Sequence, residues 1–269
     1  ANIGTSVTST LVSINHITRR EEFRRALAGA SVHDFFNLIS VVLLFPLELS
    51  TGFLRTISSY VAQGFIGVGG LQFTSPIKTA VIPSVKLLIG LMESNGTLIL
   101  IVSLVMMYLA LKFLVDLARG LVVQRAERFL HKYMFGAPLL TMLFGAVLTV
   151  LVQSSSISTS LIIPLVGAGI ITLEQIFPYT LGSNVGTTVT AMLAALSTAN
   201  VAAVRIAFAH LFFNLTGIVL IYPVRLVRNI PIRLARLLAE VTSRKRALAV
   251  AYIVLVFYII PLGVVFLWR

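Results

Sequence analysis

The sequence predicts an all-α, polytopic membrane protein with inverted-topology repeats, a re-entrant hairpin and broken helices. Composition is the first observation: 58% of the 269 residues are hydrophobic and 11% are charged, whereas a soluble domain carries about 25% charge. The second is a series of long passages without charge, and the third is a set of motifs that occurs twice in the same order. Together they place most of the chain in lipid and divide it into related halves.

The charge-free passages are long enough to cross a bilayer, which takes about 20 apolar residues. Ala247–Trp268 and Gln175–Val204 contain no charged residue, and Gly96–Leu111 is a shorter run of the same kind. We therefore expect a multi-pass protein of the cell (inner or plasma) membrane.

Basic residues predict how the chain crosses. They gather in three clusters, at 19–25, 119–132 and 225–246, and basic loops face the cytoplasm. The net charge of +12 then indicates loops lying against anionic lipid, and no nucleic-acid partner is expected. The predicted crossings alternate in direction: Ser31–Leu49, Thr97–Ala118, Gln175–Ser197, Ala202–Val224 and Ala247–Leu267.

The passage Pro138–Ile171 does not fit a simple crossing, because its start and the start of the next crossing both lie on the cytoplasmic side. We expect it to enter and return as a re-entrant hairpin with "QSSS", from Gln153, near its tip. Irregular backbone at this depth is tolerated where protein or a wet cavity surrounds it.

Two stretches of the chain match two others. "ANIGTSVTSTLVS" from Ala1 matches "SNVGTTVTAMLAA" from Ser183, and "HDFFNLISVVLLFP" from His33 matches "HLFFNLTGIVLIYP" from His210. The matching crossings have opposite predicted directions, which is the inverted-repeat arrangement of secondary transporters. An amphipathic stretch follows each copy and predicts an interfacial helix. The apolar faces are Phe53, Ile57, Tyr60 and Val61 in the first copy and Leu234, Leu237, Leu238 and Val241 in the second.

The copies divide the chain into three parts. Residues 1–96 are part of the first repeat, with its interfacial helix and an outer segment; 97–132 are a connecting transmembrane helix and a cytoplasmic amphipathic helix; 133–269 are the second repeat with the hairpin. Gln153 precedes Asn184 by 31 positions. The same distance before Asn2 lies outside the chain, so we expect the hairpin of the first repeat to be missing from this sequence.

The "QSSS" run is too dense in polar groups for the usual bond from a serine to its own helix backbone. Neutral oxygens beside a broken helix suit a cation such as Na⁺, and exposed N–H groups at a helix N-terminus suit an anion. "GSNVGTTVT" has similar chemistry, and Gly182 and Gly186 allow both a helix break and a close approach of backbones. Close helix packing through small residues is the alternative interpretation.

Two pairs of residues, His33 with Asn37 and His210 with Asn214, are four positions apart and share a helix face. We expect them to form hydrogen bonds between helices, with lining of the interior as the alternative.

Asp34 is a carboxylate within a predicted crossing, which by default is a functional hypothesis. Since it lies near the cytoplasmic end, the alternative is that it is solvated and pairs with Arg24 or Arg25.

The sequence does not favour an enzyme. It contains no Gly-x-Ser-x-Gly elbow, no His-Glu-x-x-His motif and no phosphate-cradling loop with lysine. Ser154–Ser156 have no neighbouring base, which a serine nucleophile requires. There is no cysteine for thiolate chemistry, a disulfide or a Cys-based metal site.

At these residues the chain resembles the type II sodium–phosphate cotransporter family. The resemblance rests on "QSSS" at Gln153, "ANIGTSVT" at Ala1, "GSNVGTT" at Gly182, "FRRALAGASVHDFFN" at Phe23 and "HLFFN" at His210, and covers nearly the whole chain. It implies Na⁺-driven uptake of inorganic phosphate by an inverted-repeat carrier. The short, cysteine-free outer segment indicates a bacterial-type member.

The resemblance also implies site residues and partners. The phosphate set is Gln153, Ser154, Ser155, Ser156, Asn2, Gly4 and Thr5. The Na⁺ set is Gln153, Ser155, Ser156, Ser183, Asn184, Thr187, Thr188, Thr5 and Ser6. Na⁺ is the expected coupling ion, phosphate and the lipid bilayer are the other expected partners, and a homodimer is left open. The alternative functions are a passive anion channel and a membrane scaffold or signalling subunit that binds a cytoplasmic partner through 225–246.

Overall fold

The computed structural model describes residues 2–65, 76–92, 95–120, 135–198, 200–245 and 247–267. The described ranges are helical and contain no strand, which confirms the all-α fold class. The predicted cytoplasmic helix before residue 132 and part of the outer segment lie outside the described residues. The helices are α1 (Asn2–Thr5), α2 (Val7–Ile14), α3 (Arg20–Thr51), α4 (Phe53–Gln63), α5 (Pro76–Leu91), α6 (Gly96–Gly120), α8 (Pro138–Val152), α9 (Ser155–Gly167), α10 (Leu173–Ser197), α11 (Val201–Ile221), α12 (Arg225–Arg244), α13 (Ala247–Val254), the π-helix η2 (Leu255–Ile259) and α14 (Ile260–Leu267).

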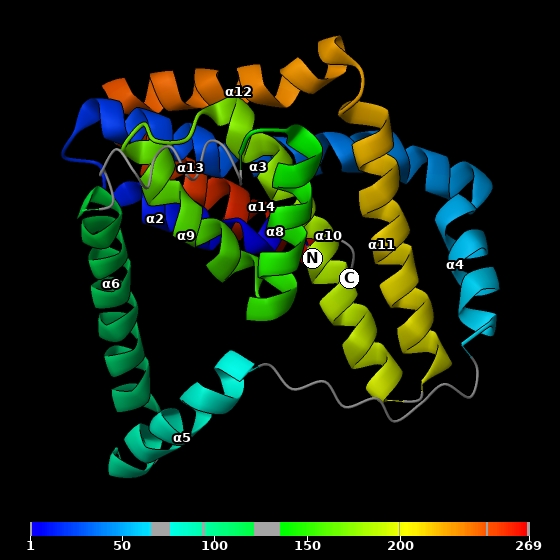
Figure 1. The fold of residues 1–269 in the computed structure, drawn as a ribbon, viewed down its shortest axis with the longest axis horizontal. Coiled ribbons are helices and arrows are strands. Elements are labelled where there is room, and N and C mark those ends of the chain that lie inside the picture. The colour runs from blue at the N-terminus through cyan, green and yellow to red at the C-terminus, as the bar shows by residue number, and fades with distance from the viewer. Residues whose placement is uncertain are drawn as a thin grey trace.

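The two matching halves of the chain pack against each other. α12 lies along α3 at the top of Figure 1, and α10 packs beside α8 and α11. α9 contacts both α2 and α3, and α11 contacts α4. Elements of the first copy (α1–α4) therefore touch elements of the second (α10–α12) and the hairpin throughout the core, as expected for repeats that share one interior.

Local signals explain where several helices begin and end. Thr172 caps α10 in a capping box with Gln175, and the Asn200 side chain accepts the Ala202 backbone N–H at 2.9 Å at the start of α11. α3 ends at Gly52, whose φ of 62° is the left-handed conformation that glycine adopts without a Cβ penalty. These residues determine where α10 and α11 begin and where α3 ends.

α10 is continuous from Leu173 to Ser197, so of the two roles that the sequence allowed for Gly182 and Gly186, the helix break does not occur. A Cβ at Gly182 would lie 1.8 Å from the carbonyl oxygen of Met142, and one at Gly186 would lie 2.6 Å from that of Ala146. The alternative interpretation therefore holds, because the glycines let α8 and α10 pack backbone to backbone. Chain interruptions occur instead between α1 and α2 and between α8 and α9.

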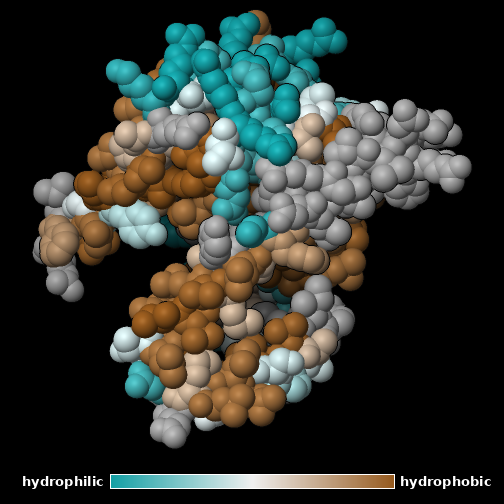
Figure 2. Space-filling view, turned by 90° about the vertical axis from the view of Figure 1, so that its left-hand side faces the viewer, coloured by the Kyte–Doolittle hydropathy of each residue, from teal (hydrophilic) through white to brown (hydrophobic). Residues whose placement is uncertain are grey.

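Length and surface chemistry agree with a membrane environment. α3 and α11 are long and apolar enough to cross a bilayer. α8 and α9, with 15 and 13 residues, are shorter than a crossing, as a re-entrant hairpin requires. Hydrophilic residues gather at the top of Figure 2, at the level of α12, with apolar residues below them. The direction of each crossing remains a prediction.

Helices form at both stretches predicted to be interfacial, as α4 and α12. α12 buries small residues, Ala235 and Ala239, against α3, and leaves Leu237 and Val241 of its predicted apolar face exposed. Tyr60 of α4 is likewise exposed. An apolar face turned outward from the protein fits a helix that lies in the headgroup region.

Candidate binding site at the hairpin tip

The tip of the hairpin consists of Gln153 and Ser154, between α8 and α9. Gln153 has φ of 55°, and within the described residues it is the only non-glycine with positive φ. Ser154 caps α9, since its hydroxyl accepts the Ile157 backbone N–H at 3.3 Å. A non-glycine residue in the left-handed region costs about 1–2 kcal/mol, and such strain gathers at functional sites.

The tip combines two opposite helix ends. The C-terminus of α8 presents carbonyl oxygens and the N-terminus of α9 presents N–H groups, so one end favours a cation and the other an anion. At the start of α9, the Ile157 N–H is capped by the Ser154 hydroxyl and the Ser158 N–H by the Ser154 carbonyl. The N–H groups of Ser155 and Ser156 remain for an anion.

The hairpin tip meets α1 of the first copy. The Ser156 hydroxyl donates to the Thr5 carbonyl oxygen at 2.9 Å, and the Thr5 hydroxyl donates to the Asn2 carbonyl oxygen at 2.8 Å. Gly4 is exposed, and a Cβ there would have no neighbour within 4 Å. The side chains of Gln153 and Ser155 form no hydrogen bond with a described residue. The structure thus brings Ser156 of the hairpin tip into contact with Thr5 of α1, so two parts of the predicted phosphate site meet. The space beside Gly4 is open.

Asn184 is the centre of a buried hydrogen-bonded group that we call the first amide clamp: His33, Asn37 and Asn184. The His33 Nε2 donates to the Asn184 Oδ1 at 2.6 Å, and the Asn184 Nδ2 donates to the Asn37 Oδ1 at 2.8 Å. This geometry assigns the Nε2–H form to His33. An asparagine of the second copy is therefore held by α3 of the first.

The second amide clamp, His210, Asn214 and Asn2, repeats this arrangement with the copies exchanged. The His210 Nε2 donates to the Asn2 Oδ1 at 2.5 Å, and the Asn2 Nδ2 donates to the Asn214 Oδ1 at 2.6 Å. The Asn214 Nδ2 also donates to the Asn184 backbone oxygen at 3.3 Å, which joins the clamps. The expected interhelical hydrogen bonds are present, and the four side-chain bonds within the two clamps each run from one copy to the other.

The structure forms a cluster of hydroxyl groups between α8, α9 and α10 that was not predicted from the sequence. Thr149 bonds Ser158 at 2.9 Å and Ser183 at 2.8 Å, and Ser158 bonds the Tyr179 hydroxyl at 2.6 Å. The signal was present, because Thr149 and Ser158 are polar residues within apolar runs on both sides of "QSSS". The cluster ties α8 and α9 to α10 and includes Ser183 of the predicted Na⁺ set.

The remaining predicted residues lie on α10 and between α1 and α2. The Thr187 and Thr188 hydroxyls donate to the backbone oxygens of Ser183 and Val185, at 2.9 and 2.6 Å. Their oxygens keep lone pairs that accept a cation. Ser6 is buried at the break between α1 and α2.

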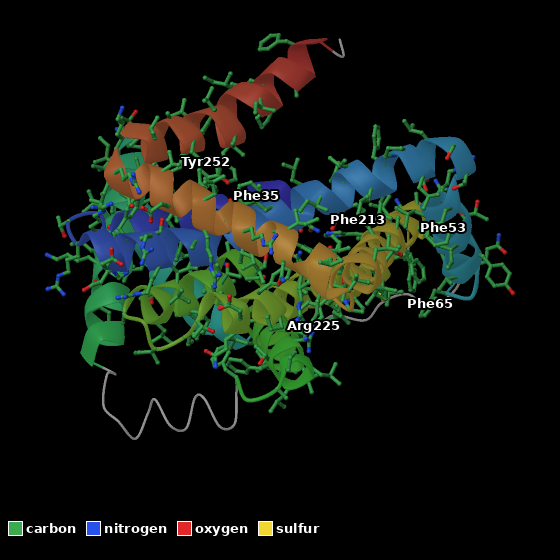
Figure 3. All side chains as sticks on the ribbon, turned by 90° about the horizontal axis from the view of Figure 1, so that it is seen from above. Phe35, Phe53, Phe65, Phe213, Arg225 and Tyr252 are labelled. Carbon is green, nitrogen blue, oxygen red and sulfur yellow. The ribbon has the colours of Figure 1, made fainter. Side chains whose placement is uncertain are left out.

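Asp34 does not pair with either arginine, so that expectation is wrong. It is buried and accepts a hydrogen bond at 2.8 Å from the Tyr252 hydroxyl of α13. Arg24 pairs with Glu21 and Glu240, and Arg25 bonds the Gly167 backbone oxygen. Seen from above in Figure 3, Tyr252 lies beside Phe35, the neighbour of Asp34 on α3. Asp34 thus anchors the C-terminal helix to the core.

Comparison with known proteins gives a consistent result. The model of a family described as "Na+/Pi-cotransporter" matches residues 104–264, more than half of the chain. The cattle (Bos taurus) protein "Sodium-dependent phosphate transport protein 2B" is 32% identical, and the match covers 98% of this chain and 52% of that protein. The sheep (Ovis aries) "Sodium-dependent phosphate transport protein 2A" is 34% identical over 97% of this chain and 53% of its own. The human (Homo sapiens) 2B protein is 31% identical, and the match covers 98% of this chain and 52% of that protein.

The chain spans about half the length of the curated relatives that it matches. No solved structure matches it. The names of these relatives are those of transporters and not of enzymes.

Proposed function

This chain belongs to the Na⁺/Pi-cotransporter family, and on that premise we propose that it forms the core of a Na⁺-coupled symporter that imports inorganic phosphate across the cell membrane. The observation that carries the proposal is the meeting of the hairpin tip with α1, where the Ser156 hydroxyl donates to the Thr5 carbonyl oxygen at 2.9 Å. Substrate and ion sites of inverted-repeat transporters lie at such a junction between copies.

The chemistry of the junction supports a neutral protein site for a charged solute and its counter-ions. An unpaired phosphate in a low-dielectric interior is very costly. Hydroxyl, amide and carbonyl oxygens around the tip would hold Na⁺, and the Na⁺ charge would offset that of phosphate. The described residues contain no group of three or more His, Cys, Asp or Glu side chains that could hold a metal. Neutral oxygens therefore support coupling to sodium more than coupling to protons.

The test is uptake of labelled phosphate into proteoliposomes that contain the full-length protein. We expect concentrative uptake that requires an inward Na⁺ gradient. The double variant Gln153→Ala, Ser155→Ala should lose at least about tenfold in initial rate, because it removes the two tip side chains that form no hydrogen bond with a described residue.

Ser31→Ala is the matched control. Ser31 is also a buried serine, but its hydroxyl donates within α3 to the Leu27 backbone oxygen at 2.8 Å, and its removal should leave uptake nearly unchanged. Uptake that persists without a Na⁺ gradient would contradict the coupling. Uptake that only equilibrates phosphate would instead support a passive anion channel. An absence of any phosphate flux, with capture of a partner through 225–246, would support a scaffold.

A further inference from the structure

A cavity of about 630 Å³ lies between α12, the N-terminal half of α3 and the turn from α9 to α10. Its walls are mainly apolar, with Val166, Ile171 and Leu237 among them, and its polar groups are three arginines and two glutamates. A mainly apolar cavity of this size with a few convergent polar groups is typical of a small-molecule or lipid site. It is separate from the hairpin tip.

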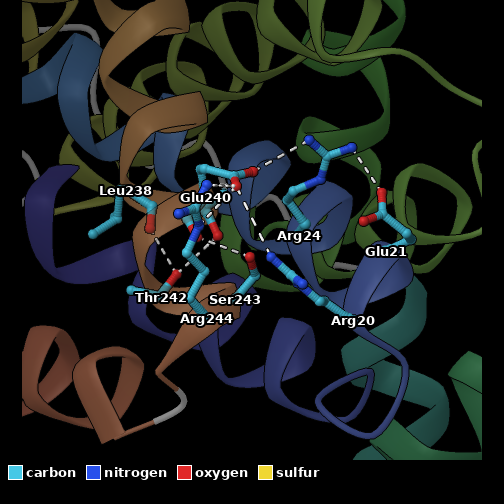
Figure 4. Close-up of polar contacts among 9 residues, drawn as sticks. Arg20, Glu21, Arg24, Leu238, Glu240, Thr242, Ser243 and Arg244 are labelled. Atoms are coloured by element: carbon cyan, nitrogen blue, oxygen red, sulfur yellow. Dashed lines mark hydrogen bonds and ion pairs between the residues drawn. The ribbon is translucent and has the colours of Figure 1, made fainter.

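Most of the charges around the cavity are already paired. Glu240 contacts Arg24 at 3.4 Å and Arg244 at 2.9 Å, and Arg24 also contacts Glu21 at 2.7 Å (Figure 4). Arg236, on the other wall, is paired with Glu174. Both glutamates of the cavity are therefore neutralised by neighbouring arginines.

Arg25 is the exception. Its Nε donates to the Gly167 backbone oxygen at 2.9 Å, and within the described residues no carboxylate pairs with it. Its two Nη groups, which carry four N–H donors in a planar fork, form no hydrogen bond there. Gly169 lies beside the guanidinium, since a Cβ at that position would be 3.5 Å from the Arg25 Cζ, which is an ordinary van der Waals distance. Arg25 is an exposed residue, so the cavity contains one uncompensated cation whose Nη groups are open to a ligand.

The surroundings of the cavity favour an amphiphile over a small hydrated anion. Leu237 is 61% exposed and Val241 is 45% exposed, so the apolar wall continues from the cavity onto the outer face of α12. α12 lies where hydrophilic residues give way to apolar ones (Figures 1 and 2). This is the level at which lipid phosphates would lie, and the basic residues of α12 predict the cytoplasmic leaflet.

We propose that this cavity binds one anionic phospholipid of the cytoplasmic leaflet, with the headgroup phosphate on the Arg25 guanidinium and the upper acyl chain along Leu237. The planar fork of arginine matches two phosphate oxygens. The lipid would join α3, the start of α10 and α12, which belong to different copies of the repeat. The proposal is independent of what the hairpin tip binds.

The experiment measures binding of dioctanoyl phosphatidylglycerol to the purified full-length protein in neutral detergent, by microscale thermophoresis. Dioctanoyl phosphatidylcholine and inorganic phosphate are the comparison probes. We expect Arg25→Gln to weaken phosphatidylglycerol binding about tenfold or more, which is the range for loss of a charge-assisted hydrogen-bonded pair. Phosphatidylcholine and inorganic phosphate should compete poorly.

Arg233→Gln is the matched control, because Arg233 is an exposed arginine on α12 outside the cavity. Arg233→Gln removes the same charge from the same exposed surface and should change the affinity less than about twofold, because Arg233 does not line the cavity and would act on the lipid only across screening solvent. Leu237→Ser alters only the apolar wall and should weaken binding severalfold; it carries the test if Arg25→Gln does not fold. Equal losses in the two arginine variants would indicate diffuse attraction and overturn the proposal. So would equal competition by inorganic phosphate, or unchanged binding in both Arg25→Gln and Leu237→Ser.

Discussion

The first amide clamp offers a quantitative test of how the two copies are joined. All three members are buried: His33 is 2% exposed, Asn37 0% and Asn184 1%. The variant Asn184→Leu keeps a similar volume but removes both side-chain hydrogen bonds, at 2.6 and 2.8 Å. It leaves the His33 Nε2–H and the Asn37 Oδ1 without their partner.

The expected cost follows from those two groups. A buried polar group left without a partner costs about 1–3 kcal/mol, so Asn184→Leu should lower the free energy of unfolding by about 2–6 kcal/mol. The direct interaction is smaller, because side-chain hydrogen bonds between membrane helices average about 0.6 kcal/mol and reach about 1.7. The short distance and complete burial place the His33–Asn184 bond at the upper end of that range.

A double-mutant cycle isolates the bond from the general cost of substitution. We would measure reversible unfolding by SDS in mixed micelles for His33→Leu, Asn184→Leu and the double variant. The expected coupling energy is about 1–1.7 kcal/mol.

The matched control is the cycle of His33→Leu with Thr242→Val, because Thr242 is also buried but its hydroxyl donates within α12 to the Leu238 backbone oxygen at 2.7 Å, outside the network that joins the two clamps. Their effects should add within about 0.3–0.5 kcal/mol. If the His33–Asn184 coupling energy were no larger than that of the control cycle, the hydrogen bond would not stabilise the contact between the copies. Our account of this interface would then fail.

Three further predictions test the packing, the tip and the cytoplasmic ion pairs. Gly182→Ala should destabilise the protein by at least about 1–3 kcal/mol through overpacking, whereas Gly4→Ala, which points into open space, should leave the melting temperature in detergent nearly unchanged. Gln153→Gly should relieve the left-handed strain and preserve or raise stability, yet lower Na⁺-dependent uptake; equal loss of both would mean that Gln153 acts only on folding. The pKa of Glu240 is lowered, mainly by the hydrogen bond from Arg244, so its stabilising contribution is present above the unfolded pKa of about 4.5 and is lost as pH falls below that value. Glu240→Gln should accordingly flatten the acid side of the stability profile measured by thermal unfolding.

The duplicated motifs predicted much of the architecture. The two amphipathic helices and the helical hairpin with "QSSS" at its turn follow from repeat and charge patterns, whereas the family resemblance implied that the tip would meet Asn2 and Thr5. Sequence spacing also placed His33 and Asn37 on one face. It could not show that their partner would be Asn184 of the other copy, because exchange between copies is a property of tertiary packing.

Gly182 and Gly186 show why the sequence could not distinguish a helix break from close helix packing. A glycine permits both a helix break and a close approach of backbones, and sequence alone does not distinguish the two. At Gly182 the neighbour decides, since the Met142 carbonyl oxygen fills the space that a side chain would need. Asp34 is similar: its proximity to Arg24 and Arg25 along the chain suggested an ion pair, but its hydrogen-bond partners are Ser6 and Tyr252, the latter more than two hundred positions away.

The directions of the hydrogen bonds narrow the roles of the predicted site residues. Phosphate needs donors and Na⁺ needs acceptors. The hydroxyls of Ser156, Thr5, Thr187 and Thr188 all donate to backbone oxygens, so each presents its lone pairs outward as an acceptor. We infer that these hydroxyls suit Na⁺ better than phosphate.

The donors left for phosphate are few and lie together at the tip. They are the backbone N–H groups of Ser155 and Ser156, the Ser155 hydroxyl and the Gln153 amide, none of which donates to a described residue. Ser156 therefore contributes a donor from its backbone and an acceptor from its side chain. Because both groups belong to one residue, phosphate and Na⁺ at this tip would be close enough to attract each other in a low-dielectric interior, so each would raise the affinity for the other.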